Sequence, residues 1–257
     1  MNEPVIIGNA ELWLGDCRDI LPTLPDASID FIFTDPPYGH NNNNGDLISR
    51  WEEALGKFTA NPEACRPILN DGPEANDLVR FAFAQADRLL AGGCCCCCCC
   101  CGGGPDPQFA RWSLWLDELL GFKHMVIWDK GPMGMGWHYR RSYETVLVGM
   151  KPGGPCRWFD ETSRVENIIR PGMGIPKILP QADDHPTPKP PALAAHFIRL
   201  HTAPGHIVLD PFMGHGSTGV GALGLGRRFI GIELDPAHFD AACRRIEDAQ
   251  RQDRLFA

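Results

Sequence analysis

The sequence predicts an α/β protein in which strands of a mostly parallel sheet alternate with helices. An apolar run, residues 29–34, has the length and composition of a buried strand. Residues 74–90 place apolar side chains at helical spacing, and the unbroken apolar run at residues 94–101 follows them. Residues 206–251 contain two further strand and helix pairs. This alternation is typical of a parallel sheet flanked by helices.

The length and charge of the chain set limits on its class. The 257 residues suit one domain, with 40–73 and 151–184 as insertions between the periodic segments. A formal charge of −8 argues against nonspecific coating of nucleic acid, but residues 111–177 hold 10 Lys or Arg against 7 Asp or Glu. This basic strip remains compatible with DNA binding.

The start of the chain has no basic region followed by a long apolar stretch, and no run approaches transmembrane length. We expect a cytoplasmic protein that does not bind membranes.

Eight of the 12 cysteines are consecutive, at residues 94–101. An unbroken run lacks the spacing that lets two thiolates share a zinc ion, and adjacent side chains of a strand point to opposite faces. We interpret the run as a buried central strand rather than as a metal or redox site, and we expect no metal cofactor.

The residues Asp35-Pro36-Pro37-Tyr38 close the first apolar run. Pro37 holds Pro36 extended and supplies no N–H, so the Pro36 carbonyl points outward from a stiff loop beside the Asp35 carboxylate. These two acceptors suit the exocyclic amino group of a nucleobase, with Tyr38 stacked on the base. The plainer alternative is a turn with a satisfied side chain.

Glycines and an acid form a second constellation after the strand at residues 206–210. Gly214, Gly216 and Gly219 fit the pattern GxGxxG, and Glu233 follows at a spacing suited to ribose hydroxyls. Alone, this pattern also fits a nicotinamide dehydrogenase, or a tight turn that binds nothing.

The segment His185-Pro186-Thr187-Pro188-Lys189-Pro190 precedes another helical pattern. Thr187 and Lys189 offer a hydroxyl and a cation that suit a small carboxylate, whereas the alternative is a proline-rich helix entry with a solvated lysine.

Together the loops DPPY, HPTPKP and DPFMGHGS, in this order, resemble the DNA amino-methyltransferases of the β arrangement, which use S-adenosylmethionine to methylate adenine N6 or cytosine N4. The resemblance spans almost the whole chain, and residues 127–130 and 143–148 look like the family's strand pair beside the base pocket.

The resemblance implies a Rossmann-like class I methyltransferase fold: a seven-stranded, mostly parallel sheet with flanking helices, the last strand antiparallel, and a small target-recognition insertion. The single domain, 1–257, then has a catalytic half at residues 1–150 and a cofactor-loop half at 185–257. The strand at residues 10–14 lies beside 228–232, and 29–34 beside 206–210. The catalytic and cofactor loops therefore meet at a switch point.

Site residues carry over from the resemblance as expectations. The catalytic residues are Asp35, Pro36, Pro37 and Tyr38. The cofactor-binding residues are Asp16, Cys17, Asp35, Thr187, Lys189, Asp210, Phe212, Gly214, Gly216, Ser217, Thr218 and Glu233. Asp16 suits the cap of a following helix equally well.

Target recognition is less defined by the sequence. Aromatic and cationic side chains suit a flipped base and phosphates, although each alone fits an ordinary strand end. The candidate DNA-binding residues are Asn41, Asn42, Lys130, Trp137, His138, Tyr139, Arg140, Arg141, Arg157, Arg164, Arg170 and Lys177. Residues 151–184 are the expected recognition segment, and a segment this short suggests a homodimer on double-stranded DNA.

The loop DPPY, rather than SPPY, favours adenine N6 over cytosine N4. A nicotinamide oxidoreductase leaves DPPY and HPTPKP without a role, and a noncatalytic DNA-binding module needs a stronger basic face. Both remain alternatives, and an orphan enzyme is indistinguishable from a restriction-system partner.

Overall fold

The structure is a computed structural model, and it describes residues 3–39, 68–100, 108–131, 142–173, 175 and 189–256, without the side chains of 99, 100, 108, 109 and 252–256. The strands are β1 (Val5–Ile7), β2 (Ala10–Leu14), β3 (Ile29–Thr34), β4 (Leu90–Cys100), β5 (Phe122–Asp129), β6 (Tyr143–Met150), β7 (Ile168–Ile169), β8 (Ile207–Asp210) and β9 (Arg228–Glu233). The helices are α1 (Cys17–Ile20), the 3₁₀ turn η1 (Leu21–Thr23), α3 (Ala75–Leu89), α4 (Gln108–Leu120), α5 (Pro191–His201), α6 (Ser217–Leu223) and α7 (Pro236–Phe256).

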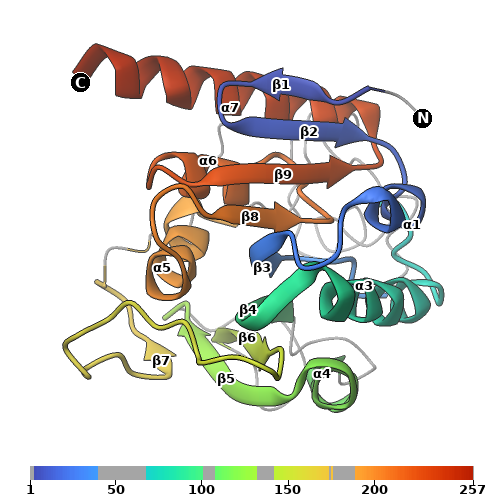
Figure 1. Cartoon of the computed structure of the whole chain (residues 1–257), viewed down its shortest axis with the longest axis vertical. Coiled ribbons are helices and arrows are strands. Elements are labelled where there is room, and N and C mark those ends of the chain that lie inside the picture. Colours follow the sequence, from blue (N-terminus) through green and yellow to red (C-terminus); the bar gives the residue numbers. More distant parts are fainter. Residues whose placement is uncertain are drawn as a thin grey trace, which may run out of the picture.

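The strands form one sheet in the order β1-β2-β9-β8-β3-β4-β6-β5-β7 (Figure 1). Strands β2, β9, β8, β3 and β4 are parallel, and β6 is inserted antiparallel between β4 and β5. Within the described residues the sheet has nine strands. The seven expected strands are therefore extended by two short edge strands, the β1 hairpin arm and the two-residue β7.

The two ends of the chain interleave at the centre of the sheet. β2 pairs with β9 and β3 pairs with β8, which confirms both predicted neighbours. Strand order reverses between β8 and β3, so this pair of strands is the switch point at which open α/β sheets bind ligands.

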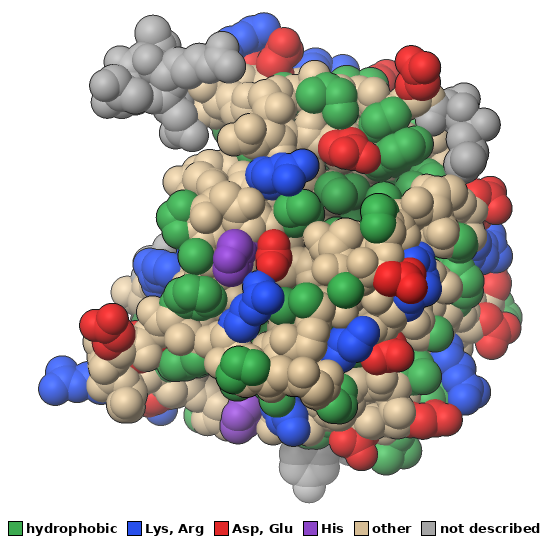
Figure 2. Space-filling model, in the orientation of Figure 1, with side chains coloured by type: hydrophobic (Ala, Val, Ile, Leu, Met, Phe, Trp, Pro, Cys, Tyr) green, Lys and Arg blue, Asp and Glu red, His purple; other side chains and the backbone are tan. Residues whose placement is uncertain are grey.

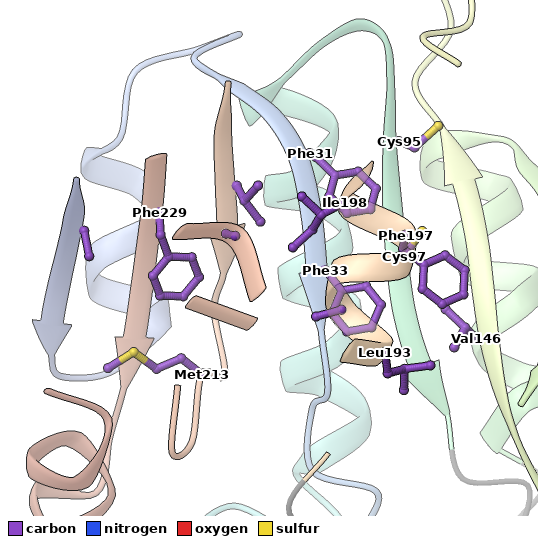
Figure 3. Close-up of a cluster of buried hydrophobic side chains, with 14 of the residues drawn as sticks. Phe31, Phe33, Cys95, Cys97, Val146, Leu193, Phe197, Ile198, Met213 and Phe229 are labelled. Atoms are coloured by element: carbon purple, nitrogen blue, oxygen red, sulfur yellow. The ribbon is translucent and has the colours of Figure 1, made fainter. Parts of the chain in front are cut away.

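Helices cover both faces of the sheet (Figure 1). On one face, α5, α6 and α7 pack on alternate side chains of the strands, among them Phe31, Phe33 and Phe229 (Figure 3). On the other face, α1, α3 and α4 pack on the intervening side chains, such as Ile32 and Leu209. The period-2 alternation of a strand buried on both faces explains why β3 reads as a continuous apolar run.

The cysteine run lies in β4, next to β3 at the centre of the sheet. Cys94, Cys95, Cys96, Cys97 and Cys98 are at most 3 % exposed, and they alternate between the two faces. This confirms the prediction of a buried central strand.

Strand β4 begins earlier than the cysteines, at Leu90, so the predicted helix stop at residues 91–93 is wrong. The chain turns directly from α3 into the strand, because Leu90 is already extended. A bulge then absorbs Gly93, whose φ of +80° favours glycine, between the register pairs Ile29 with Leu90 and Phe31 with Cys95.

In the described part of the chain, no helix is both long enough and apolar enough to cross a bilayer.

Candidate active site

Polar residues gather along one edge of the sheet, where the parallel strands end. Asp35 follows β3, Asp210 ends β8, Glu233 ends β9 and Asp16 follows β2 by one residue. Because β6 runs antiparallel, its second residue, Glu144, lies at this same edge. The edge therefore collects side chains from both halves of the chain.

The catalytic loop, residues 35–38, is held by its own side chains and by α4. The Tyr38 hydroxyl donates a hydrogen bond to Oδ1 of Asp35. The Tyr38 ring packs at 6.1 Å from the ring of Trp112, which is fully buried and donates to Asn76. The loop is thus fixed to the helix layer, with the Asp35 side chain partly exposed at 27 %.

Lys189 lies beside Asp35 although 154 residues separate them. Its Nζ is 2.8 Å from Oδ2 of Asp35 and 3.2 Å from the Tyr38 hydroxyl. The side chain is only 11 % exposed. The structure therefore brings Lys189 to the catalytic loop.

Asp210 organises the junction between β3 and the glycine loop. Its carboxylate accepts from Thr34 Oγ1 at 2.9 Å, the Phe212 backbone N–H at 3.1 Å and Thr218 Oγ1 at 2.6 Å. Burial raises the pKa of Asp210 to about 6, against the hydrogen bonds that lower it. Asp210 and Thr218 therefore shape the loop from inside, because their side chains are buried and bonded to one another.

Glu233 joins the ends of β9 and the glycine loop. Its Oε2 accepts from the Gly214 N–H at 2.9 Å and its Oε1 from the Asp235 N–H at 2.8 Å. Burial raises the pKa of this carboxyl to about 7. Each oxygen accepts one of these backbone N–H groups, and an ionised carboxylate has about four acceptor sites, which leaves capacity for two neighbouring hydroxyls.

The glycine loop, residues 211–216, turns sharply into α6. Gly214 and Gly216 have φ values of +50° and +75°, which favour glycine. A Cβ on Gly216 would also lie 3.1 Å from Cβ of Ala242 in α7. The two glycines are thus required by backbone conformation, and the second also by packing against α7.

Asp16 caps α1 by accepting from the Arg18 N–H at 2.8 Å, and it also binds the Arg18 side chain. The capping interpretation is confirmed, while its contact with a cofactor stays a prediction. The Cys17 thiol faces the core, and burial raises its pKa to about 12. A side-chain contact from Cys17 therefore finds no support in this geometry.

The candidate DNA contacts that the structure describes fall in two places. Lys130 and Arg170 lie at the edge that carries Asp35, since β7 runs parallel to the end of β5. Lys130 binds Glu144 at 2.7 Å and Arg170 pairs with Glu166. Arg164 precedes β7 and is exposed. Figure 2 shows acidic and basic side chains interspersed over the visible face.

Arg157 lies at the opposite edge, and the prediction that it contacts the target DNA beside the catalytic loop is wrong. Its guanidinium binds Oδ1 of Asp30 at 2.6 Å, near the beginning of β3. Asp30 also accepts the N–H of Ile207, the first residue of β8. Five residues of extended strand, about 16 Å, separate this site from Asp35.

Several sequence-based candidates lie outside the described residues, and so does most of the 40–73 insertion. These candidates are Asn41, Asn42, Trp137, His138, Tyr139, Arg140, Arg141, Lys177 and Thr187.

Two contributors to the site were missed by the sequence reasoning. Thr34 reads as the last residue of a strand, and Glu144 as the beginning of another. The charged residues Lys130 and Glu144 at neighbouring strand ends were the available signal for the second. Among the described residues, no group of three His, Cys, Asp or Glu side chains could hold a metal ion.

Comparison with known proteins identifies the family. The family model of the N6/N4 methyltransferases, described as DNA methylase, matches residues 29–244. The DNA adenine methyltransferase YhdJ of Escherichia coli K12 is 26 % identical over 265 residues, covering 96 % of this chain and 86 % of that protein.

Solved structures share the fold. The DNA modification methylase TTHA0409 of Thermus thermophilus, in complex with S-adenosyl-L-methionine, has a TM-score of 0.65 at 24 % identity, covering 93 % of this chain and 95 % of that one. The cytosine-N4-specific PvuII DNA methyltransferase has a TM-score of 0.67 at 18 % identity, covering 98 % and 95 %. The match of the family model to most of the chain shows that this protein belongs to the N6/N4 family of DNA methylases.

Proposed function

We propose that this protein transfers a methyl group from S-adenosylmethionine to the N6 amino group of adenine in DNA. The observation that carries the proposal is the junction of the two loops: Asp35 directly follows Thr34, whose hydroxyl binds Asp210 at the beginning of the glycine loop. An amino group held by Asp35 is thereby placed next to a ligand held by that loop. Proximity of this kind supplies much of the rate acceleration in direct displacement reactions.

The residues at the edge fit S-adenosylmethionine. Glu233 retains acceptor capacity for two ribose hydroxyls, and Gly214 and Gly216 allow a ligand to approach the backbone. Phe212 and Ser217 are partly exposed beside them. When bound there, the cofactor supplies a sulfonium methyl group to the amino nitrogen.

Asp35 and the Pro36 carbonyl position the target base. They accept its two amino N–H groups, so that the nitrogen lone pair is directed toward the methyl group instead of into the ring. The base reaches them only outside the duplex, and a Tyr38 ring stacked on it offsets the unstacking by about 1–3 kcal/mol. The surplus proton of the methylated amino group leaves afterwards.

Adenine is favoured over cytosine by the loop DPPY and by the relative named as an adenine methyltransferase. Cytosine N4 is the second candidate, because the N4-specific PvuII enzyme covers 98 % of this chain with the same fold. Both amino groups present the same pair of donors.

Lys130 and Arg170 are proposed as DNA contacts at the edge of the site, together with the exposed Arg164. A homodimer would supply a second recognition surface, and sedimentation of the purified protein with and without a DNA duplex tests it.

Long-read sequencing that detects modified bases tests the reaction, on DNA from cells expressing the wild-type chain. N6-methyladenine at one short motif supports the proposal and gives the recognition site. N4-methylcytosine would replace adenine by cytosine, and an unmodified genome would contradict DNA as the substrate.

A further inference from the structure

Lys189 is shared between two carboxylates at the active-site edge. Its Nζ lies 2.8 Å from Oδ2 of Asp35 and 3.5 Å from Oε2 of Glu144. These partners come from different parts of the sheet, since Asp35 follows β3 and Glu144 belongs to β6. The ammonium group thus has a close partner and a second one within reach.

The close partner is the residue that the proposed reaction requires. An amino N–H of a base must be accepted by the Asp35 carboxylate, yet Oδ2 of Asp35 is occupied by Lys189 and Oδ1 by the Tyr38 hydroxyl. Entry of the base therefore displaces at least one of these donors. Tyr38 can rotate its hydroxyl, but an ammonium group that is 11 % exposed needs another anion.

Glu144 has the capacity to be that anion. Its Oε1 binds Lys130 at 2.7 Å, whereas its Oε2 is buried and has no hydrogen bond within the described residues. A buried acceptor of this kind is costly unless a donor reaches it. Lys189, at 3.5 Å, is at the outer limit of such a bond.

The charge state of Glu144 agrees with this geometry. Burial raises the pKa of this carboxyl, but the ammonium groups of Lys189 and Lys130 outweigh burial and hold the pKa below its usual range. Glu144 is therefore a carboxylate at neutral pH.

We propose that Glu144 is a positioning residue that takes the Lys189 ammonium from Asp35 when the target base enters. The exchange frees Oδ2 of Asp35 for the amino group and completes the hydrogen bond to Oε2 of Glu144. This inference rests on the proposed role of Asp35 in methyl transfer.

The first test is the Glu144→Gln variant, which keeps the shape and removes the charge. Transfer of tritiated methyl groups to unmethylated genomic DNA gives kcat/KM for DNA, and calorimetry gives the Kd for S-adenosylmethionine. We expect kcat/KM to fall 10- to 100-fold at pH 7.5 while the Kd changes less than threefold. Glu144→Asp, which retains a carboxylate, should recover part of the loss and guards against misfolding of the first variant.

The pH profile separates the exchange from a structural role. Asp35, Tyr38 and Glu144 face the Lys189 ammonium, and Lys130 lies across Glu144 from it. In Glu144→Gln, base entry leaves Lys189 without an anion, so entry is coupled to loss of the lysine proton. Between pH 7.5 and 9.5 kcat/KM of this variant should rise by up to about tenfold per unit, but that of the wild type should not. A Tyr38 titration would appear in both proteins.

A double-mutant cycle with Lys189→Met gives an independent readout. When no ammonium needs relocation, adding Glu144→Gln should change kcat/KM less than threefold. Equal losses from Glu144→Gln in both backgrounds, or a flat pH profile with wild-type kcat/KM, would overturn the inference. Absence of methyl transfer by the wild type would instead contradict the proposed function.

Discussion

The Thr34 hydroxyl donates a 2.9 Å hydrogen bond to Oδ1 of Asp210, across the pair of strands where the order of the sheet reverses. These residues are 176 positions apart in the chain. Thr34 is 3 % exposed and directly precedes Asp35, so the bond ties the catalytic loop to the glycine loop.

Removing this junction should weaken cofactor binding. Asp210→Ala leaves Phe212 N–H and two buried hydroxyls without their acceptor, at a cost of about 1–3 kcal/mol for each group that stays unpaired. We expect the Kd for S-adenosylmethionine to rise at least tenfold in calorimetry. Thr34→Val removes one bond only and should lower the free energy of unfolding by about 1 kcal/mol. An unchanged Kd in Asp210→Ala would show that the loop keeps its shape without this carboxylate.

Cofactor affinity should depend on pH through Glu233. Its pKa of about 7 in the unliganded protein is raised by burial, and ribose hydroxyls bind the ionised form. Protons therefore compete with the cofactor, and affinity should fall about tenfold from pH 8 to pH 6. Calorimetry at both pH values measures it. Glu233→Gln is the control, because titration of the cofactor itself persists in that variant while the Glu233 contribution disappears.

The same group should make the unliganded fold less stable at high pH. The folded-state pKa of Glu233 lies above its usual value of 4.5, so the protonated form is favoured by folding. This contribution is complete below pH 4.5 and is lost as the pH rises through 7. Glu233→Gln cannot ionise, so its stability relative to wild type should increase by about 2–3 kcal/mol between pH 4.5 and pH 8. Urea denaturation at these pH values measures the difference, and a constant difference would contradict the buried carboxyl.

The buried cysteines should be inert in the folded protein. Burial raises the pKa of Cys95 to about 12 and that of Cys96 well above its usual value, whereas Cys156 is exposed. Iodoacetamide at pH 7.5, followed by peptide mass spectrometry, should label Cys156 and leave residues 94–98 unmodified until denaturant is added. Labelling of residues 94–98 at the rate of Cys156 would contradict a buried β4.

Local sequence was sufficient for the sheet but not for the pairing of charges within it. The apolar run of β3 and the glycines after β8 show their roles within a few residues, and Asp16 signals its cap within two. The partner of Arg157, Asp30, lies 127 residues away, so the cation was read as a DNA contact. Lys189 was likewise assigned to the cofactor carboxylate, because its bond to Asp35 spans 154 residues.

The additional edge strands were missed for a related reason. β1 has three residues and β7 two, which is too short for an alternating pattern to stand out. Both are defined by pairing with a neighbour, β1 with β2 and β7 with β5. Their existence depends on tertiary contacts.

The most direct test of the proposed mechanism is single-turnover methyl transfer to DNA by wild type and Asp35→Ala, with cofactor affinity measured on the same preparations. The carboxylate is required to hold the amino group, so Asp35→Ala should lose transfer at least a thousandfold, about 4 kcal/mol, while binding S-adenosylmethionine within a few-fold of wild type. Transfer by Asp35→Ala at a rate near that of wild type would contradict the assignment of Asp35 and the mechanism that depends on it.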